Sequence, residues 1–203
     1  MRLIPLAVLF IVTALAGCSN DPEPAPPVPP PGVTEITVEI PTMTNGSIIR
    51  PRYTCDGINL SPEVTWSGVP ENAVTQALIL NDPDAPDGAY IHWLVYDIPP
   101  DVRGFGEGFG KPFETTDSGA YQSLNSAGDL GYSGPCPPDG ETHIYQISVY
   151  ALDRALEVPP LTGRAEVLAG MEGGVIGYGV TEAGYRRIPR FEEIIVFHLT
   201  PTP

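Results

Sequence analysis

A proline-rich run divides the chain and limits where it can fold. Residues 20–32 read N-D-P-E-P-A-P-P-V-P-P-P-G. Proline lacks a backbone N–H and holds φ at about −65°, so the run favours an extended polyproline II conformation over helix or sheet. It also contains too few apolar side chains to build a core. We therefore expect residues 18–32 to be a semi-rigid spacer and residues 33–203 to form one domain, since about 170 residues can bury a sound core.

The segment before the spacer has the features of a secretory leader. Arg2 provides the positive start, and residues 3–15 are apolar apart from Pro5 and Thr13. This stretch is shorter than the roughly 20 apolar residues of a membrane-spanning helix, and its length is typical of a leader. We expect residues 1–17 to be a signal peptide.

The leader ends in Leu-Ala-Gly-Cys at residues 15–18, which resembles a bacterial lipobox. The resemblance implies cleavage before Cys18 and attachment of three acyl chains, palmitate among them, to that cysteine. Several acyl chains anchor a protein stably, whereas one binds only marginally. We expect a lipid-anchored protein of the cell envelope, and Ser19 resembles an outer-membrane sorting signal if the source is Gram-negative. A buried cysteine in an ordinary helix is the alternative to lipidation.

The charge balance argues against one class of partner. The chain has 25 acidic and 10 basic residues, a formal net charge of −15, and no segment rich in Lys or Arg. Binding to DNA or RNA depends on clustered cations that displace counterions from phosphates. We expect no nucleic-acid partner.

Short strands dominate the coarse secondary structure. Ile36, Val38 and Ile40 alternate with polar residues, which is the period of a half-buried strand. Other short runs bounded by Gly, Pro and Asp predict further strands. These lie at residues 74–81, 91–98, 143–152 and 193–199.

One segment predicts a helix, at residues 163–171. Its apolar face is expected to carry Ala165, Leu168 and Met171, and the two glycines that follow Glu172 are a plausible stop. With strands in the majority, the predicted fold class is mostly β, a sandwich or barrel with few short helices.

Two motifs combine a rigid loop with a histidine near the start of a strand. Residues 81–88 read N-D-P-D-A-P-D-G and precede His92, and residues 131–140 read G-Y-S-G-P-C-P-P-D-G and precede His143. The second motif ends the long segment 104–140, which is longer than incidental connections usually are. We expect the two motifs to be matching walls of one site.

Strand alternation places both histidines at the ends of apolar stripes. One face is predicted to carry His143, Tyr145, Ile147 and Val149, and another to carry His92, Leu94 and Tyr96. Polar side chains at the mouth of a core form a pocket. Alone, the first motif would predict only a turn, and a calcium loop does not fit because its twelfth position is Trp93 instead of Glu.

These motifs occur in the order of a known family. The set consists of C-D-G at residues 55–57, Ser61-Pro62, Trp66, the loop 81–88, His92, the loop 131–140 and His143. Together they resemble the bacterial branch of the phosphatidylethanolamine-binding protein family, also called the Raf kinase inhibitor-like family. The resemblance extends over residues 33–185.

This resemblance implies an antiparallel β-sandwich with a small cavity for phosphate-like or phospholipid head groups or small carboxylates. It implies binding without catalysis, and neither a cofactor nor a metal. The ligand-binding residues that it implies are Asp82, His92, Gly134, Pro135, Cys136, Pro137, His143 and Tyr145.

The chemistry of these residue types agrees with an anion site. Imidazoles donate hydrogen bonds to phosphate oxygens, and main-chain N–H groups of a glycine-rich loop can add donors. Asp82 is expected to orient or charge a histidine, because a bare carboxylate would repel the anion. Protonation should therefore strengthen binding.

Two other classes of function stay open. The same His and Asp side chains could serve a metal-dependent or acid-base hydrolase, although the sequence has no H-E-x-x-H or G-x-S-x-G motif. The domain could also regulate a protein partner, which the sequence does not name. A monomer and a homodimer are both compatible with it.

The cysteine count raises a further question. Of the three cysteines, lipidation would occupy Cys18 and leave Cys55 and Cys136 in an oxidising compartment. A disulfide between them and a pair of buried thiols are both open. Trp66 and Trp93 are expected in the core or cavity walls, and His198 receives no role.

Overall fold

The computed structural model describes residues 24–86, 89–109 and 118–188. Its elements are β1 (Thr34–Glu35), β2 (Thr37–Glu39), β3 (Ser47–Ile48), a 3-10 helix (Pro51–Tyr53), β4 (Val64–Ser67), β5 (Thr75–Asp82), β6 (Tyr90–Ile98), β7 (Gly104–Phe105), β8 (Tyr121–Gln122), β9 (Thr142–Leu152), α1 (Arg164–Met171) and β10 (Val175–Arg186). The predicted class, mostly β with little helix, is confirmed.

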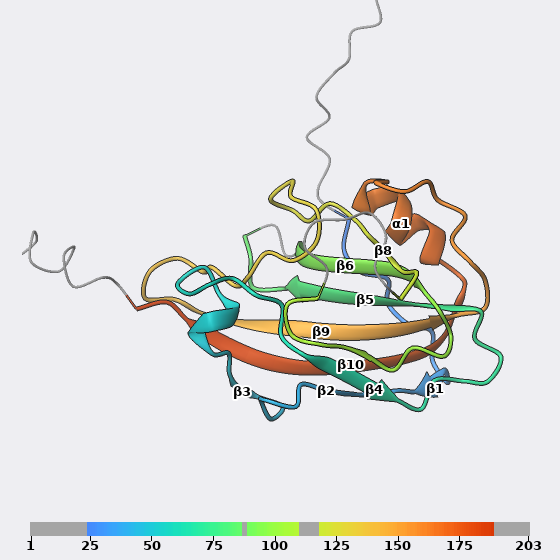
Figure 1. The fold of residues 1–203 in the computed structure, drawn as a ribbon, viewed down its shortest axis with the longest axis horizontal. Helices are drawn as coiled ribbons and strands as arrows, with labels where there is room; N and C mark the ends of the chain where they lie inside the picture. The colour runs from blue at the N-terminus through green and yellow to red at the C-terminus, as the bar shows by residue number, and fades with distance from the viewer. Residues whose placement is uncertain (1–23, 87–88, 110–117, 189–203) are drawn as a thin grey trace, which may run out of the picture.

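The strands form two sheets. The larger has the order β1-β10-β9-β5-β6-β8, with β3 also paired to β10, and the smaller has the order β2-β4-β7 (Figure 1). Strands β1 and β3 pair parallel with β10, and the other pairs are antiparallel. The larger sheet is therefore mixed, which differs from the expectation of purely antiparallel strands.

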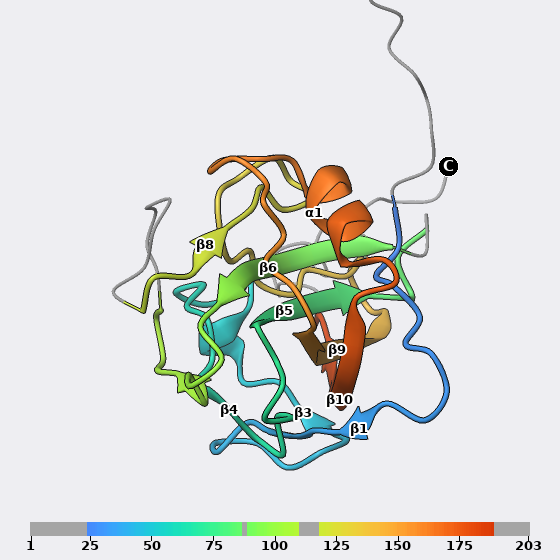
Figure 2. The same cartoon turned by 90° about the vertical axis from the view of Figure 1, so that its right-hand side faces the viewer.

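The larger sheet is covered on both faces. Leu78 and Leu80 of β5 join the core between the two sheets, and Ile79 points to the opposite side, toward α1. Figure 2 shows this order of layers, with the smaller sheet below the larger one and α1 above it. Because both faces are covered, every residue of β5 is buried. That double coverage holds the end of this strand, where Asp82 lies, in a rigid frame.

The core between the sheets contains both tryptophans, as expected. Trp66 donates from Nε1 to Gln76 Oε1 at 2.7 Å, and Trp93 donates from Nε1 to Gln122 Oε1 at 2.9 Å. Each indole is buried with its one polar atom satisfied, so burial of the ring carries no unpaired donor.

Helix α1 lies where the sequence predicted it, but its buried face differs. Val167, Leu168 and Met171 pack against the large sheet, whereas Ala165 is exposed. The predicted face with Ala165 was wrong because the larger Val167 side chain buries more apolar surface when the helix turns that side inward.

Strand β10 was not predicted. Its glycines at 177, 179 and 184 weaken the strand pattern, yet it pairs with β9 along almost its whole length. The segment that leads to Ile36 runs alongside β10 as a parallel neighbour, and a Cβ at Gly179 would lie 1.9 Å from the Ile36 carbonyl oxygen. Position 179 is a glycine because the backbone of Ile36 fills the space that a side chain would need.

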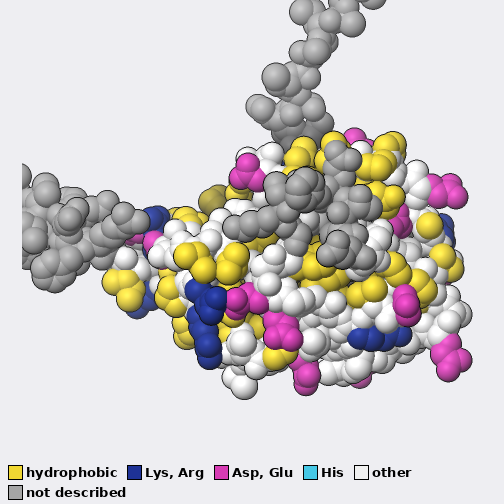
Figure 3. Space-filling view, viewed as in Figure 1, with side chains coloured by type: hydrophobic (Ala, Val, Ile, Leu, Met, Phe, Trp, Pro, Cys, Tyr) yellow, Lys and Arg dark blue, Asp and Glu magenta, His cyan; other side chains and the backbone are white. Residues whose placement is uncertain are grey.

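Several predictions fall outside the described residues. They concern the leader 1–17, the lipidated Cys18, the strand 193–199 and His198. Among the helices that the structure describes, none has the length and apolar character needed to cross a bilayer. Figure 3 shows acidic side chains dispersed over one face, with few basic ones between them.

Candidate functional site

A pocket of about 230 Å³ opens where β5 ends and β6 and β9 begin. Asp82, the last residue of β5, pairs in register with Tyr90, the first of β6. The full lining is Asp82, Ala85, Pro86, Tyr90, His92, Ser133, Gly134, Cys136, Pro137, Pro138 and His143. The two sequence motifs therefore lie on one pocket.

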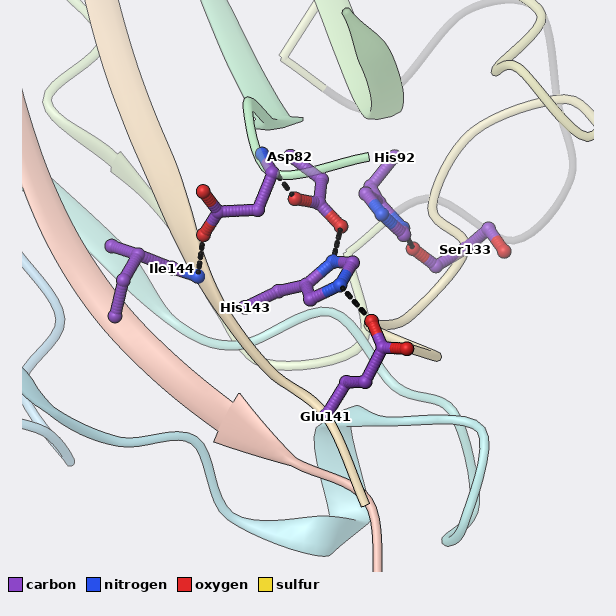
Figure 4. A network of polar contacts seen from close by, with 7 residues as sticks. Asp82, His92, Ser133, Glu141, His143 and Ile144 are labelled. Carbon is purple, nitrogen blue, oxygen red and sulfur yellow. Dashed lines mark hydrogen bonds and ion pairs between the residues drawn. The ribbon is translucent and has the colours of Figure 1, made fainter. Parts of the chain in front are cut away.

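Asp82 holds His143 by a short hydrogen bond. The Asp82 Oδ2 atom accepts from His143 Nδ1 at 2.7 Å, and both side chains are almost fully buried (Figure 4). The second oxygen of Asp82, Oδ1, accepts from the main-chain N–H of Asp84 at 2.9 Å. The main-chain N–H of Asp84 thus orients the Asp82 carboxylate, and this carboxylate orients the His143 imidazole. The Nε2 atom of His143 is directed away from Asp82.

These contacts alter the proton affinity of His143. Burial by itself would lower the pKa of His143, but the hydrogen bond and charge of Asp82 outweigh it, with smaller contributions from Glu141 and Asp84. The pKa is therefore raised above its ordinary value of 6.5. His143 is disposed to be a cation that donates from Nε2.

His92 reaches the pocket through an irregularity of the sheet. The pairing of β5 with β6 shifts register at this point, since Leu80 pairs with Trp93 and Asn81 pairs with Ile91. His92 is the extra residue between these two pairs. Such a bulge changes the direction of the side chains around it.

The predicted common face of His92, Leu94 and Tyr96 is therefore wrong. Leu94 and Tyr96 pack on the side of the sheet covered by α1. The His92 ring instead lies edge-on to Tyr145, with 5.3 Å between ring centroids, and Tyr145 belongs to the core between the sheets. The predicted face of His143, Tyr145, Ile147 and Val149 has its three apolar members in that core, as expected.

His92 is disposed to be neutral, in contrast to His143. Its Nδ1 lies 2.8 Å from the carbonyl oxygen of Ser133, which can only accept, so Nδ1 carries the proton. Burial lowers the pKa of His92, and the Ser133 bond and the charge of Asp82 oppose this only in part. With the proton on Nδ1, the Nε2 atom of the neutral ring is an acceptor.

The loop of the second motif is fastened to the segment that follows the 3-10 helix. Cys136 is bonded to Cys55 in a disulfide with 5.4 Å between their Cα atoms. Gly134 donates its N–H to Asn59 Oδ1 at 2.7 Å, and Cys55 donates its N–H to the Pro135 carbonyl at 3.1 Å. The sequence left the pairing of these two cysteines open, and the structure joins them beside the pocket.

These bonds also change one expectation about the loop. The N–H of Gly134 is taken by Asn59, and the N–H of Ser133 donates to the His92 carbonyl at 2.8 Å. Neither is available to a ligand as the loop stands. The imidazoles therefore carry more of any anion recognition than the sequence suggested.

Two of the predicted ligand residues do not line the pocket. Pro135 is buried within the loop, and Tyr145 is only 1% exposed, behind the two histidine rings. Burial, together with the nearby charge of Asp82, raises the pKa of Tyr145. Its hydroxyl has no hydrogen bond of normal geometry to the described residues. Tyr145 supports the histidines from behind.

Five lining residues were not among the predictions, namely Ala85, Pro86, Tyr90, Ser133 and Pro138. Four of them belong to the two motif loops and could have been included on that ground. Tyr90 could not, because only the pairing of β6 with β5 brings it opposite Asp82. Its ring lies 4.7 Å from that of His92 and forms an apolar wall.

In the part of the chain that the structure describes, no three or more His, Cys, Asp and Glu side chains converge in a way that could hold a metal ion. The pocket instead brings together one histidine whose pKa is raised and one whose pKa is lowered.

Comparison with known proteins gives consistent matches. A family model described as phosphatidylethanolamine-binding protein matches residues 39–186. A protein named UPF0098 from Methanothermobacter thermautotrophicus is 45% identical over 139 residues, which cover 68% of this chain and 91% of that relative. LppC of Mycobacterium tuberculosis, whose name describes it as a lipoprotein, is 36% identical over 173 residues, covering 77% of this chain and 83% of LppC.

Solved structures agree. CT736 of Chlamydia trachomatis, described as a homologue of the phosphatidylethanolamine-binding protein, has a TM-score of 0.65 at 34% identity and covers 76% of this chain and 98% of its own. YbcL of Escherichia coli, described as a member of the mammalian PEBP family, has a TM-score of 0.68 at 31% identity, covering 74% and 98%. The similarity thus extends through the fold and both motif loops.

Proposed function

The chain belongs to the phosphatidylethanolamine-binding protein family, and from this premise we propose that its pocket binds the phosphate-like group of a small ligand or of a phospholipid head group. The family is one of ligand-binding proteins, and the resemblance seen in the motifs is confirmed by the match over residues 39–186.

The observation that carries this proposal is the contrast between the two imidazoles. The hydrogen bond from Asp82 at 2.7 Å favours the protonated form of His143, whereas burial favours the neutral form of His92, with its Nδ1 bonded to the Ser133 carbonyl. A phosphate monoester that keeps one proton offers an anionic oxygen and a hydroxyl. The head group of phosphatidylethanolamine, whose phosphodiester has no hydroxyl, offers an anionic oxygen and an ammonium donor. A volume of about 230 Å³ suits a head group and leaves acyl chains outside.

A titration of the mature protein tests the proposal. Inorganic phosphate, phosphorylethanolamine and vesicles containing phosphatidylethanolamine form three arms, so that free phosphate compounds and lipid head groups are distinguished. We expect His143→Ala and His92→Ala each to lose about tenfold or more in affinity, because a charged hydrogen bond contributes about 1.5–3 kcal/mol.

Gln146→Ala is the control, since Gln146 lies on β9 but bonds Glu182 on the exposed surface, away from the pocket. Unchanged affinity in His92→Ala and His143→Ala would overturn the proposal. Turnover of phosphoesters by the wild type would point to the hydrolase instead.

We also propose that a lipid on Cys18 anchors this domain in the cell envelope. The leader and lipobox support it, as does the lipoprotein name of LppC. Mass spectrometry of the mature N-terminus should find acylated Cys18, and Cys18→Ser should release the protein from membranes. Fractionation of a Gram-negative host would test the outer-membrane sorting that Ser19 suggests.

A further inference from the structure

We propose that Glu141 is a displaceable carboxylate of the protein itself, which occupies the anion position at His143 and so sets how strongly the pocket accepts anions. This inference rests on the proposed function, because it concerns the same pocket. It adds a residue that neither the motifs nor the pocket lining had singled out.

One ring nitrogen of His143 is already occupied by a hydrogen bond. Its Nδ1 is bonded to Asp82 Oδ2 at 2.7 Å, which leaves Nε2 as the one ring nitrogen able to meet a ligand. Glu141 Oε2 lies 3.5 Å from that Nε2. Figure 4 shows Asp82 and Glu141 on opposite sides of the ring, with Glu141 reaching back from the residues just before β9. A carboxylate oxygen thus lies in the direction from which an anion would approach.

The two carboxylates beside His143, those of Asp82 and Glu141, differ in burial. The Asp82 side chain is 6% exposed and is fixed by the Asp84 N–H, whereas the Glu141 side chain is 61% exposed. The contact of Glu141 with His143 is long, at 3.5 Å, and water competes for the exposed carboxylate, so this contact is the weaker of the two. Asp82 is therefore a permanent partner of His143, and Glu141 is an exchangeable one.

A ligand anion has to compete with Glu141 for His143. An anion that binds Nε2 at hydrogen-bond distance has to displace the Glu141 carboxylate, and it meets like-charge repulsion if the carboxylate stays nearby. Anions with a weak contact to His143 are thereby rejected. The pocket also keeps a counterion for its cationic histidine when no ligand is present.

The test compares Glu141→Gln with Asp139→Asn in the mature protein. Both variants remove one negative charge from the same loop, and neither residue is part of the pocket lining. Glu141 contacts His143 Nε2, whereas Asp139 pairs with Arg187 at 3.2 Å. Inorganic phosphate is the probe, titrated below the pKa of His143 measured for each protein, so that the imidazole is charged throughout. Circular dichroism checks that each variant is folded.

We expect Glu141→Gln to bind phosphate about two- to fivefold more tightly than wild type. This factor corresponds to loss of the ion pair in which the exposed Glu141 carboxylate competes with phosphate for His143. Asp139→Asn should match wild type. Without ligand, nuclear magnetic resonance should show the pKa of His143 lowered in Glu141→Gln and unchanged in Asp139→Asn.

Three results would overturn the inference. If phosphate binds wild type but no more tightly to Glu141→Gln, the carboxylate does not compete, and the proposed function still stands. An equal gain in Asp139→Asn would mean that only general charge is involved. If phosphate binds none of the proteins, the proposed function falls and this inference falls with it.

Discussion

Asp82 and His143 form a buried pair at the end of two neighbouring strands, with 2.7 Å between Oδ2 and Nδ1 and less than a tenth of either side chain exposed. Removing the negative charge of Asp82 should therefore lower both the stability of the fold and its affinity for anions. We expect Asp82→Asn to lower the pKa of His143 and to lower the free energy of unfolding by about 1–3 kcal/mol, because a buried hydrogen-bonding group loses its charged partner. Denaturant unfolding and histidine NMR titration measure the two effects. A variant as stable as wild type, with the same His143 pKa, would contradict this.

Anion affinity should fall as pH rises through the pKa of His143. The folded-state pKa lies above 6.5, so the imidazole loses its charge on the alkaline side of that value. The measurement is a series of titrations across this range with a monoanion whose own charge is constant. Affinity that is flat, or that increases with pH, would show that the charge of His143 does not contribute.

His92 should make the fold sensitive to acid. Its folded-state pKa is lowered below 6.5, so its stabilising contribution is complete above 6.5 and is lost as pH falls from there through the folded-state value. His143 has the opposite sign, with a contribution complete below 6.5 and lost as pH rises through its own raised pKa. Comparing the free energy of unfolding of wild type and His92→Gln at pH values above and below 6.5 isolates His92. Wild type should lose more stability in acid than the variant, and equal losses would count against the assignment.

The disulfide should stabilise the fold and the pocket together. Cys55 and Cys136 are 81 residues apart, and closing a loop of that size contributes about 4 kcal/mol in the chain-entropy model. Replacing both cysteines by serine should lower the free energy of unfolding by about that amount and weaken phosphate binding, since Cys136 lines the pocket. Alkylation followed by intact-mass measurement should find neither cysteine free in the native protein.

Two glycines of β10 should respond differently to the same substitution. A Cβ at Gly179 would lie 1.9 Å from the Ile36 carbonyl oxygen, whereas one at Gly184 meets its nearest neighbour, Ile144, at an ordinary 3.4 Å. Gly179→Ala should cost at least about 2–3 kcal/mol of stability or prevent folding, and Gly184→Ala should cost less than about 1 kcal/mol. Thermal unfolding measures the stability of both variants. Similar losses of stability would show that the segment around Ile36 can move away from Gly179.

Much of the site could be read from residue order. The family resemblance of the two motif loops implies Asp82, Gly134, Cys136 and the two histidines as pocket residues, and all five lie on the pocket lining. Strand alternation also placed Tyr145 correctly on the core face of β9. Alternation does not show how deep that face lies. The family resemblance implies Tyr145 as a ligand residue, but its side chain is buried behind the rings.

By itself, then, the sequence determined the mostly β class and the two loops that line the pocket, and the division into leader, spacer and domain stays a prediction. These follow from local backbone preferences and from short-range alternation. Only the tertiary structure decided the direction of His92 and the existence of β10. Each depends on a neighbour distant in sequence or on a one-residue shift in strand register, and neither leaves a periodic pattern in the chain.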